Sequence, residues 1–588
     1  MDKILSLITE EVSKAFAQKG YSENFGKSSS SNRPDLCEYQ CNGAMAAAKV
    51  YHKAPFLIAD EIKEALNDNK LFESVESVKP GFLNIILNKQ FLADYLNGMD
   101  SDQRYGCDKA KKKKTIVIDY GGPNVAKPLH VGHLRTAIIG ESIKRIQKFM
   151  GHEVFGDVHM GDWGLPMGLI MTELKVRKPQ LSYFDSGYCG EYPKEAPFTL
   201  TELEEIYPYA SSYAKEHPEY KEDAMQATVY IQQGIPGYKA LLEQILKISV
   251  EDLKKNYGNL NVSFELWKGE SDAQPFIPAM VEKMKKDGFA HVSEGALVVD
   301  VKEDTDTKEI PPCIIEKSDG ASLYATTDLA TLVQRMQDYH PDEILYVVDK
   351  RQDMHFVQVF RCARKIGIIP DTVKLEFLGF GTMNGKDGKP FKTREGGVMR
   401  LETLLSDINE QMYEKIAENH TVEEEEGRKT AKMVALSAIK YGDLSNQASK
   451  DYVFDLERFT SFEGNTGPYL LYTIVRMKSI LTKYSKAGKN AEQYRILPAH
   501  SESEKELMTV ISGFNAMMEN ASLENAPHKV CSYLYELANA FNHFYHETKI
   551  MIEENQEIQG GYIKLLILTK NIMETCIDVL GFEAPDRM

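Results

Sequence analysis

Apolar runs that alternate with amphipathic stretches predict a sheet-and-helix core for this chain. Continuous apolar runs at residues 115–120 and 343–349 have the length and composition of strands buried on both faces. A run at 375–380 predicts another strand, and helical spacing begins at Leu134, soon after the first strand. Because strands that alternate with helices are typical of parallel sheets, we expect a Rossmann-type, doubly wound α/β domain over residues 111–400.

The patterns outside this core predict two further domains and one insertion. Residues 1–110 mix helical spacing with a strand and predict an N-terminal α+β domain. A stretch rich in Glu, Lys and Tyr at about 172–295 predicts a helical insertion in the α/β domain. Residues 401–450 predict a helical connection. Residues 451–588 carry apolar stripes at helical spacing, which predict a C-terminal all-α bundle.

Composition and charge narrow the classes of function. The 588 residues are 43% hydrophobic and 27% charged, and no apolar run approaches the ~20 residues of a membrane span. The first residues lack the apolar core of a signal peptide, and eight scattered cysteines suggest free thiols. We therefore expect a cytoplasmic protein without a membrane segment. A net charge of -17 argues mildly against non-specific nucleic-acid binding but leaves room for a local basic surface.

The segment from Thr115 to Leu134 carries the clearest candidate chemistry. A buried strand is followed by a Gly-Gly-Pro-Asn turn, by His130-Val-Gly-His133, and then by the start of a helix. A strand, a glycine turn and a helix start present backbone N–H groups to a phosphate. The two histidines add directed hydrogen-bond donors, so this segment predicts a nucleotide site.

Polar residues also follow the later strands. Residues 350–355 come directly after the strand at 343–349, and therefore lie at the carboxyl edge of the sheet, where α/β proteins bind ligands. A loop at 381–397 contains five glycines and four basic residues. Taken alone, this loop could be a basic surface hairpin. Its position after a core strand makes it a candidate phosphate contact.

These segments together resemble the class I aminoacyl-tRNA synthetases. His130-Val-Gly-His133 is similar to the HIGH signature of that family, and Lys389-Pro-Phe-Lys-Thr-Arg394 occupies the place of the KMSKS signature without matching it. The flanking residues resemble the arginyl-tRNA synthetases over nearly the whole chain. The matching segments are Ile118 to His130, Gly161-Asp-Trp-Gly164, Phe459 to Tyr469 and Glu583 to Met588.

The resemblance implies ATP-dependent activation of L-arginine and transfer of the arginyl group to the 3′-terminal ribose of tRNA(Arg). Mg²⁺ is expected on the ATP phosphates, with no metal site of the protein's own, and we expect a monomer. The N-terminal domain is expected to contact tRNA and the C-terminal bundle to bind the anticodon. The implied ATP-binding residues are Asn124, Lys127, His130, Gly132, His133 and Lys392. The implied catalytic residues are His130, His133, Lys389, Lys392 and Arg394, and the sequence does not distinguish the roles of the last three.

Arginine recognition needs carboxylates arranged for a planar guanidinium fork. Asp119 and Asp328 are the candidates, because both are expected at strand-end positions. Asn124, Tyr324 and Gln352 match family positions that hold the polar ends of the substrate. Either aspartate alone could equally be a helix cap or part of a structural salt bridge. Their joint occurrence favours a ligand role.

Other functions remain open from the residues. A nucleotidyltransferase of the same fold would not need the long helical C-terminus, and a synthetase for an uncharged amino acid would not need the two aspartates. A non-catalytic RNA-binding paralogue would not need intact histidines. The N-terminal domain could contact RNA through Lys49, Lys53 and Lys79, or could serve only for packing.

Overall fold

The computed structural model describes residues 1–588 except 34, 319–322, 390–398 and 420–422. Within it the chain forms two compact units. One unit comprises Ala110–Phe459. The other joins Met1–Lys109 to Thr460–Met588.

The unit Ala110–Phe459 is built around a four-stranded parallel sheet with the spatial order β11–β10–β5–β6. The strands are β5 (Thr115–Tyr120), β6 (Glu153–Asp157), β10 (Glu343–Asp349) and β11 (Lys374–Phe380). The apolar runs predicted at 115–120 and 343–349 coincide with β5 and β10. The chain runs from β5 to β6 on one side and from β10 to β11 on the other, so the direction of winding reverses between β5 and β10.

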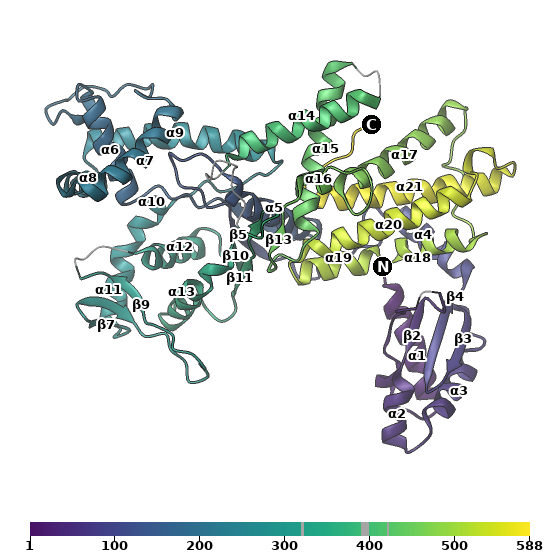
Figure 1. The fold of residues 1–588 in the computed structure, drawn as a ribbon. Coiled ribbons are helices and arrows are strands. Elements are labelled where there is room, and N and C mark those ends of the chain that lie inside the picture. Colours follow the sequence, from purple (N-terminus) through teal and green to yellow (C-terminus); the bar gives the residue numbers. More distant parts are fainter. Residues whose placement is uncertain (34, 319–322, 390–398, 420–422) are drawn as a thin grey trace. The chain divides into compact units, whose positions relative to one another are not determined.

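Helices cover both faces of this sheet (Figure 1). Helix α5 (Leu134–Phe149) connects β5 to β6, α13 (Asp353–Lys365) connects β10 to β11, and α12 (Tyr324–Asp338) precedes β10. Because parallel crossovers are right-handed, connections that run in opposite directions place α5 and α13 on opposite faces. Helix α5 is buried along most of its length, since α15 (Glu424–Leu444) packs against it in addition to the sheet. The expected Rossmann-type fold is therefore confirmed.

The remaining elements of this unit lie between and after the core strands. Between β6 and α12 lie α6 (Leu165–Arg177), α7 (Leu200–Glu216), α8 (Pro218–Gln232), α9 (Pro236–Asn259), α10 (Glu270–Ala273), α11 (Ile277–Lys286), β7 (Ala290–Ser293), β8 (Ala296–Val299) and β9 (Cys313–Glu316). After β11 come β12 (Met383–Asn384), α14 (Leu401–Asn419), α15, β13 (Tyr452–Val453) and α16 (Leu456–Phe459). Strand β7 falls inside the stretch expected to be helical, because its residues pair with the apolar run of β8.

The second unit contains an α+β part and a helical part. The α+β part has a sheet of order β1–β2–β4–β3, with β1 (Ser28–Ser30), β2 (Tyr39–Cys41), β3 (Phe72–Val78), β4 (Phe82–Leu87), α1 (Ile4–Gln18), α2 (Gly43–Tyr51), α3 (Pro55–Leu66) and α4 (Lys89–Ser101). The helical part consists of α17 (Gly467–Lys486), α18 (Glu502–Ser512), α19 (Phe514–Leu523), α20 (Pro527–Glu547) and α21 (Gln556–Val579). The expected α+β domain and all-α bundle are both present.

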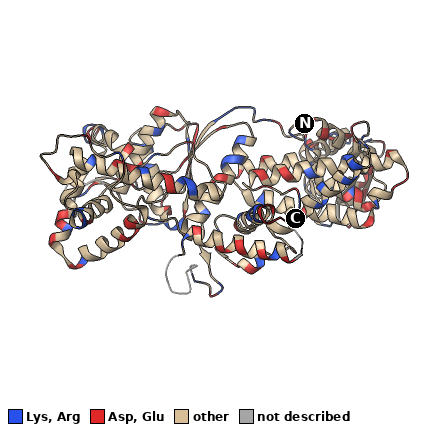
Figure 2. Ribbon diagram, turned by 90° about the horizontal axis from the view of Figure 1, so that it is seen from above, with Lys and Arg blue, Asp and Glu red and all other residues tan. Residues whose placement is uncertain are grey.

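Acidic and basic residues are interspersed along the helices of both units (Figure 2). The net charge of -17 is thus a sum over mixed surfaces. It does not describe the local charge at any one site. In the part of the chain that the structure describes, no helix combines the length and apolarity needed to span a membrane.

Candidate active site

A cavity of about 530 Å³ opens at the carboxyl ends of the parallel strands. Its walls come from the residues after β5, β10 and β11 and from the start of α5. Among the residues that line it are Asp119, His130, Gly132, His133 and Gln352. The reversal of winding between β5 and β10 creates the crevice in which α/β folds bind ligands. The structure thus brings the histidine signature, one predicted carboxylate and one predicted amide to a single cavity.

The two signature histidines are fixed by backbone hydrogen bonds. His130 Nδ1 accepts from the N–H of Gly132 at 3.0 Å, and His133 Nδ1 accepts from the N–H of His130 at 3.2 Å. The rings lie 4.0 Å apart between centroids. Because each Nδ1 is an acceptor, each neutral ring carries its proton on Nε2. The arrangement supplies two Nε2–H donors at a helix start.

Burial keeps both histidines neutral. It lowers the pKa of His133 to about 3, with the neighbouring His130 ring adding to the effect. The pKa of His130 is also lowered, first by burial and then by the positive charge of Lys127. Gly132 makes this packing possible, because a Cβ at that position would lie 2.7 Å from the His130 ring. The spacing H-x-G-H therefore has a steric reason as well as a chemical one.

Thr136 fixes the first turn of α5 to the sheet. Its Oγ1 donates to the carbonyl of Val347 in β10 at 2.7 Å and accepts from the N–H of Gly121 after β5 at 2.9 Å. The two strands that flank the reversal point are thus both linked to one hydroxyl. This linkage sets the position of the histidines relative to the strand ends.

Asp119 is already engaged by a cation of the protein. Its Oδ2 lies 2.5 Å from Nη2 of Arg335, which also binds Oδ2 of Asp157 at 2.7 Å. Arg335 is fully buried on α12, and both carboxylates are buried as well. The structural salt bridge that the sequence left open for Asp119 is therefore present. Asp119 also lines the cavity, so its predicted role as an arginine ligand stays a prediction.

Asp328 lies within α12 and not at the strand end that the sequence predicted. Its Oδ2 lies 2.6 Å from Nε2 of His355, three residues beyond Gln352 on the cavity wall. Helix α10 packs against α12 and carries Glu270 at its first position. The pKa of Glu270 is raised to about 7, mainly by burial; the charge of His159 opposes this shift, and the carboxylates of Asp162 and Asp328 add to it. The two acids thus lie on neighbouring helices, close enough for the charge of Asp328 to act on Glu270.

The carboxylate of Glu270 is available to bind a ligand. Within the described part of the chain its carboxylate has neither a hydrogen bond nor an ion pair. The charge of Glu270 also contributes to raising the pKa of Tyr324, after burial. Sequence reasoning missed Glu270, because α10 is a single short turn without an apolar period. A usable signal would have been an acid at a helix start in a segment otherwise assigned to an insertion.

The other predicted residues that the structure describes are not among those that line the cavity. Asn124 is exposed and pairs with Gly161 in an isolated parallel bridge. Lys127 places its Nζ 4.1 Å from the centre of the Tyr207 ring. Tyr324 is 71% exposed at the start of α12. Lys389 is exposed, while Lys392 and Arg394 lie outside the described residues.

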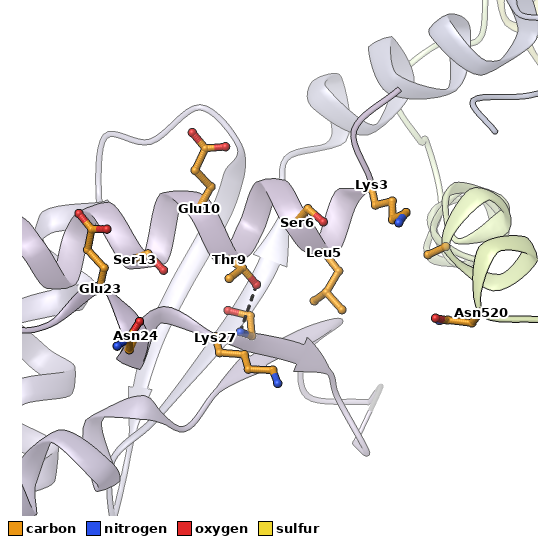
Figure 3. Close-up of a pocket in the computed structure, with 12 residues that line it drawn as sticks. Lys3, Leu5, Ser6, Thr9, Glu10, Ser13, Glu23, Asn24, Lys27 and Asn520 are labelled. Atoms are coloured by element: carbon orange, nitrogen blue, oxygen red, sulfur yellow. Dashed lines mark hydrogen bonds between the residues drawn. The ribbon is translucent and has the colours of Figure 1, made fainter. Parts of the chain in front are cut away.

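Two other hollows and one acidic cluster were candidates for chemistry. A hollow of about 710 Å³ beside α1 is lined by small polar residues, two lysines and two glutamates, and Figure 3 shows Thr9 bonded to the backbone of Ser28 there. An apolar pocket of about 400 Å³ lies between α11 and α12. Ligand atoms of Asp119, Asp157 and His159 lie within 4.8 Å of one another. The single guanidinium of Arg335 already contacts both carboxylates of that cluster.

The cavity offers little to a metal ion apart from a substrate's own ligands. Two carboxylates line it, Asp119 and Asp349. Asp119 pairs with Arg335, and Asp349 Oδ2 pairs with Nη2 of Arg351 at 2.7 Å. A divalent cation needs hard oxygen ligands that are free to bind it. Each of the two acids that line the cavity is therefore already paired with an arginine of the protein.

A parallel sheet with an H-x-G-H helix start at its reversal point defines a class I aminoacyl-tRNA synthetase catalytic domain. A family model described as "tRNA synthetases class I (R), catalytic domain" matches residues 97–456. The "DALR anticodon binding domain" model matches residues 470–588, and the "Arginyl tRNA synthetase N terminal domain" model matches residues 2–87. The chain belongs to the arginyl-tRNA synthetase family, as its sequence predicted.

Individual relatives agree with the family models. An arginine–tRNA ligase of Agathobacter rectalis is 66% identical over 597 residues, and one of Alkaliphilus oremlandii is 54% identical over 588 residues, each covering all of both chains. Solved arginyl-tRNA synthetases share the fold. That of Plasmodium falciparum has a TM-score of 0.80 at 23% identity over the whole of both chains. That of Thermus thermophilus has a TM-score of 0.77 at 21% identity, over 99% of this chain and 100% of the other.

Proposed function

We propose that this chain is an arginine–tRNA ligase that activates L-arginine with ATP and transfers it to tRNA(Arg). The observation that carries the proposal is the cavity at the reversal point, which brings two neutral histidines and Gln352 together at the carboxyl ends of the strands. The phosphates of ATP need hydrogen-bond donors such as His130 and His133, and the guanidinium of arginine needs carboxylates such as those of Glu270 and Asp328. Family membership and the full-length relatives support the same reading.

The first step is attack of the arginine carboxylate on the α-phosphorus of ATP, with diphosphate as the leaving group. The Nε2–H donors of His130 and His133 are directed to ATP oxygens, and the helix start adds its partial positive charge. Since neither ring carries a charge near neutral pH, both stabilise developing charge by hydrogen bonding. The cation enters as MgATP. Lys127 supplies a fixed positive charge near the same turn.

The basic loop is proposed to bind the leaving phosphates. Lys389, Lys392 and Arg394 are the candidates from the sequence, and Lys389 alone of the three lies within the described residues. By comparison with mapped phosphate and oxyanion donors, one such contact is worth about 2.7–4 kcal/mol in the transition state. The resemblance does not assign separate roles to these three residues.

The guanidinium of the substrate is proposed to bind Glu270 together with Asp328. Glu270 on α10 and Asp328 on α12 belong to helices that pack on each other, and Glu270 has no cation of its own among the described residues. Asp119 differs, since Arg335 satisfies its charge, so we propose that it holds the strand end and contacts the substrate at most through its free oxygen. Tyr324, Gln352 and Asn124 keep the role of holding the polar ends of arginine.

The second step transfers the arginyl group to a hydroxyl of the 3′-terminal ribose and releases AMP. The C-terminal bundle is proposed to bind the anticodon, and the N-terminal α+β domain to contact tRNA elsewhere. We propose the divisions 1–110, 111–400, 401–450 and 451–588 for these tasks. A monomer in the cytoplasm is the proposed form. Its eight free cysteines are consistent with a reducing compartment.

The test is charging of total tRNA with ATP and each standard amino acid in turn. Arginine is expected to be esterified and every other amino acid rejected, because a site built for a planar charged fork leaves its acids unpaired with an uncharged side chain and poorly paired with the single ammonium of lysine. Charging with a different amino acid would refute the specificity. Absence of charging, with no arginine-dependent AMP formation, would refute the activity.

A further inference from the structure

Arg135 connects three separate segments of the catalytic unit. It is the second residue of α5, and only 2% of its surface is exposed. Its Nη1 donates to the carbonyl of Gly381 at 2.6 Å and to that of Lys450 at 3.1 Å. Its Nε lies 3.1 Å from Oδ2 of Asp443 near the end of α15. One guanidinium thus joins the end of β11, the end of α15 and the segment before β13 to the signature helix.

The aromatic and acidic neighbours hold this guanidinium in place. Its central carbon lies 4.8 Å from the ring centre of Tyr452. The hydroxyl of Tyr452 donates to Asp443 Oδ2 at 2.8 Å, so the acid is bound from both sides. Asp443 is itself 1% exposed. A buried arginine with an acid, two carbonyls and an aromatic face has little freedom to move.

The segment that Arg135 holds is a wall of the cavity. Residues 380–383 line the cavity together with His130 and His133. Gly381 packs so closely on the next segment that a Cβ would lie 2.4 Å from the carbonyl carbon of Lys450. Beyond it, β12 pairs in parallel with β13, and Gly381 N–H donates to Ala448 at 2.9 Å. The wall is therefore attached to backbone on its outer side and to Arg135 on its inner side.

We propose that Arg135 is a positioning residue that sets the width of the ATP cavity, by holding the 380–383 wall at a fixed distance from the signature histidines. The inference rests on the proposed function of this cavity as the ATP site. Arg135 also lines the cavity itself, but its Nη1 donates to two protein carbonyls and its Nε lies beside Asp443, so we attribute its effect on ATP to the wall that it holds. The protein would use the same short helix turn to hold the phosphates, through His130 and His133, and to place the opposite wall.

The proposal predicts different effects on the binding of ATP and on the binding of arginine. Glu270 and Asp328, the proposed arginine ligands, lie on α10 and α12, and the contacts of Arg135 described above are to neither helix. A change in the Arg135 contacts should therefore weaken ATP binding and leave arginine binding nearly unchanged. General unfolding of the domain would instead weaken both.

Arg135→Lys is the sharpest variant. Lysine keeps a positive charge opposite Asp443, but its single ammonium cannot reproduce the planar fork that reaches Asp443 and two carbonyls together. We expect the Kd of a non-hydrolysable ATP analogue, measured by calorimetry on the full chain, to rise about tenfold or more, with KM for arginine within about twofold of the wild type. Equal increases for both ligands, or no change for the analogue, would overturn the proposal.

Arg145→Lys is the matched control. Arg145 lies further along the same helix and pairs with Glu141 at 2.8 Å, away from the cavity. Both constants are expected to stay within about twofold. If Arg135→Lys does not fold, Tyr452→Phe removes one hydrogen bond to Asp443 and should give a smaller change in the same direction. A wild-type chain that binds no ATP analogue would refute the proposed function itself. Wild-type binding that is unaltered in Arg135→Lys and in Tyr452→Phe would refute the inference alone.

Discussion

Replacement of Glu270 by glutamine tests the arginine site most stringently. The side chain keeps its size, but the carboxylate that has no cation among the described residues is lost. A charged hydrogen bond is worth about 1.5–3 kcal/mol, so kcat/KM for arginine should fall about 10- to 150-fold in Glu270→Gln. KM for ATP should change little, because Glu270 is not among the residues that line the cavity.

The pH dependence of kcat/KM for arginine tests the role of Glu270 independently of the substitution. The pKa of Glu270 is raised to about 7, so its charged form is present above that pH and is lost as the pH falls. Arginine is a cation and needs the charged form. The free enzyme should therefore lose about tenfold in kcat/KM for arginine between about pH 8 and about pH 6. His133 does not contribute to this change, because its pKa is about 3.

The assay is aminoacylation of tRNA with limiting arginine, measured across that pH range for three proteins. The wild type should show the acid limb, and Glu270→Gln should show a low, flat profile. Glu282→Gln is the matched control, since Glu282 is an exposed acid of the neighbouring helix α11, and it should behave like the wild type. An acid limb that persists in Glu270→Gln would refute the assignment. So would a kcat/KM that equals the wild-type value at the higher pH.

Three further substitutions address other parts of the site. Asp328→Asn should raise KM for arginine about tenfold or more, and an unchanged KM in steady-state aminoacylation would refute its role. His133→Ala should slow adenylate formation about 10²- to 10³-fold in a single-turnover assay while tRNA affinity stays the same; loss of tRNA binding would show that His133 is not an ATP ligand. Arg335→Met should destabilise the catalytic unit by about 3–5 kcal/mol, because it leaves Asp119 and Asp157 buried without a cation; an unchanged unfolding midpoint in urea would contradict this.

The parts of the fold that depend on local pattern could be predicted from the sequence. The apolar runs at 115–120 and 343–349 became β5 and β10, because a strand buried on both faces has no polar alternation. The histidine signature could also be recognised in the sequence, because its spacing is set by the contact between Gly132 and the His130 ring. Local sequence carries these features because the groups that interact are only a few residues apart.

Partners that are distant in sequence could not be predicted. Asp119 was expected to meet the substrate, but Arg335, which lies 216 residues away in the chain, takes up its charge. No spacing rule links the two positions. Glu270 was passed over because its one-turn helix has no period, and only the packing of α10 on α12 brings it toward Asp328. The carboxylate pair proposed for the substrate therefore changed from Asp119 with Asp328 to Glu270 with Asp328.

A crystal structure with a non-hydrolysable arginyl-adenylate analogue would show which residues bind the guanidinium and which bind the phosphate. The account predicts that the guanidinium lies between the carboxylates of Glu270 and Asp328, and that the phosphate oxygen accepts from Nε2 of His130 or His133. Arg335 should remain bound to Asp119 and Asp157. An analogue whose guanidinium displaces Arg335 to bind Asp119, or whose phosphate lies away from both histidines, would contradict the account.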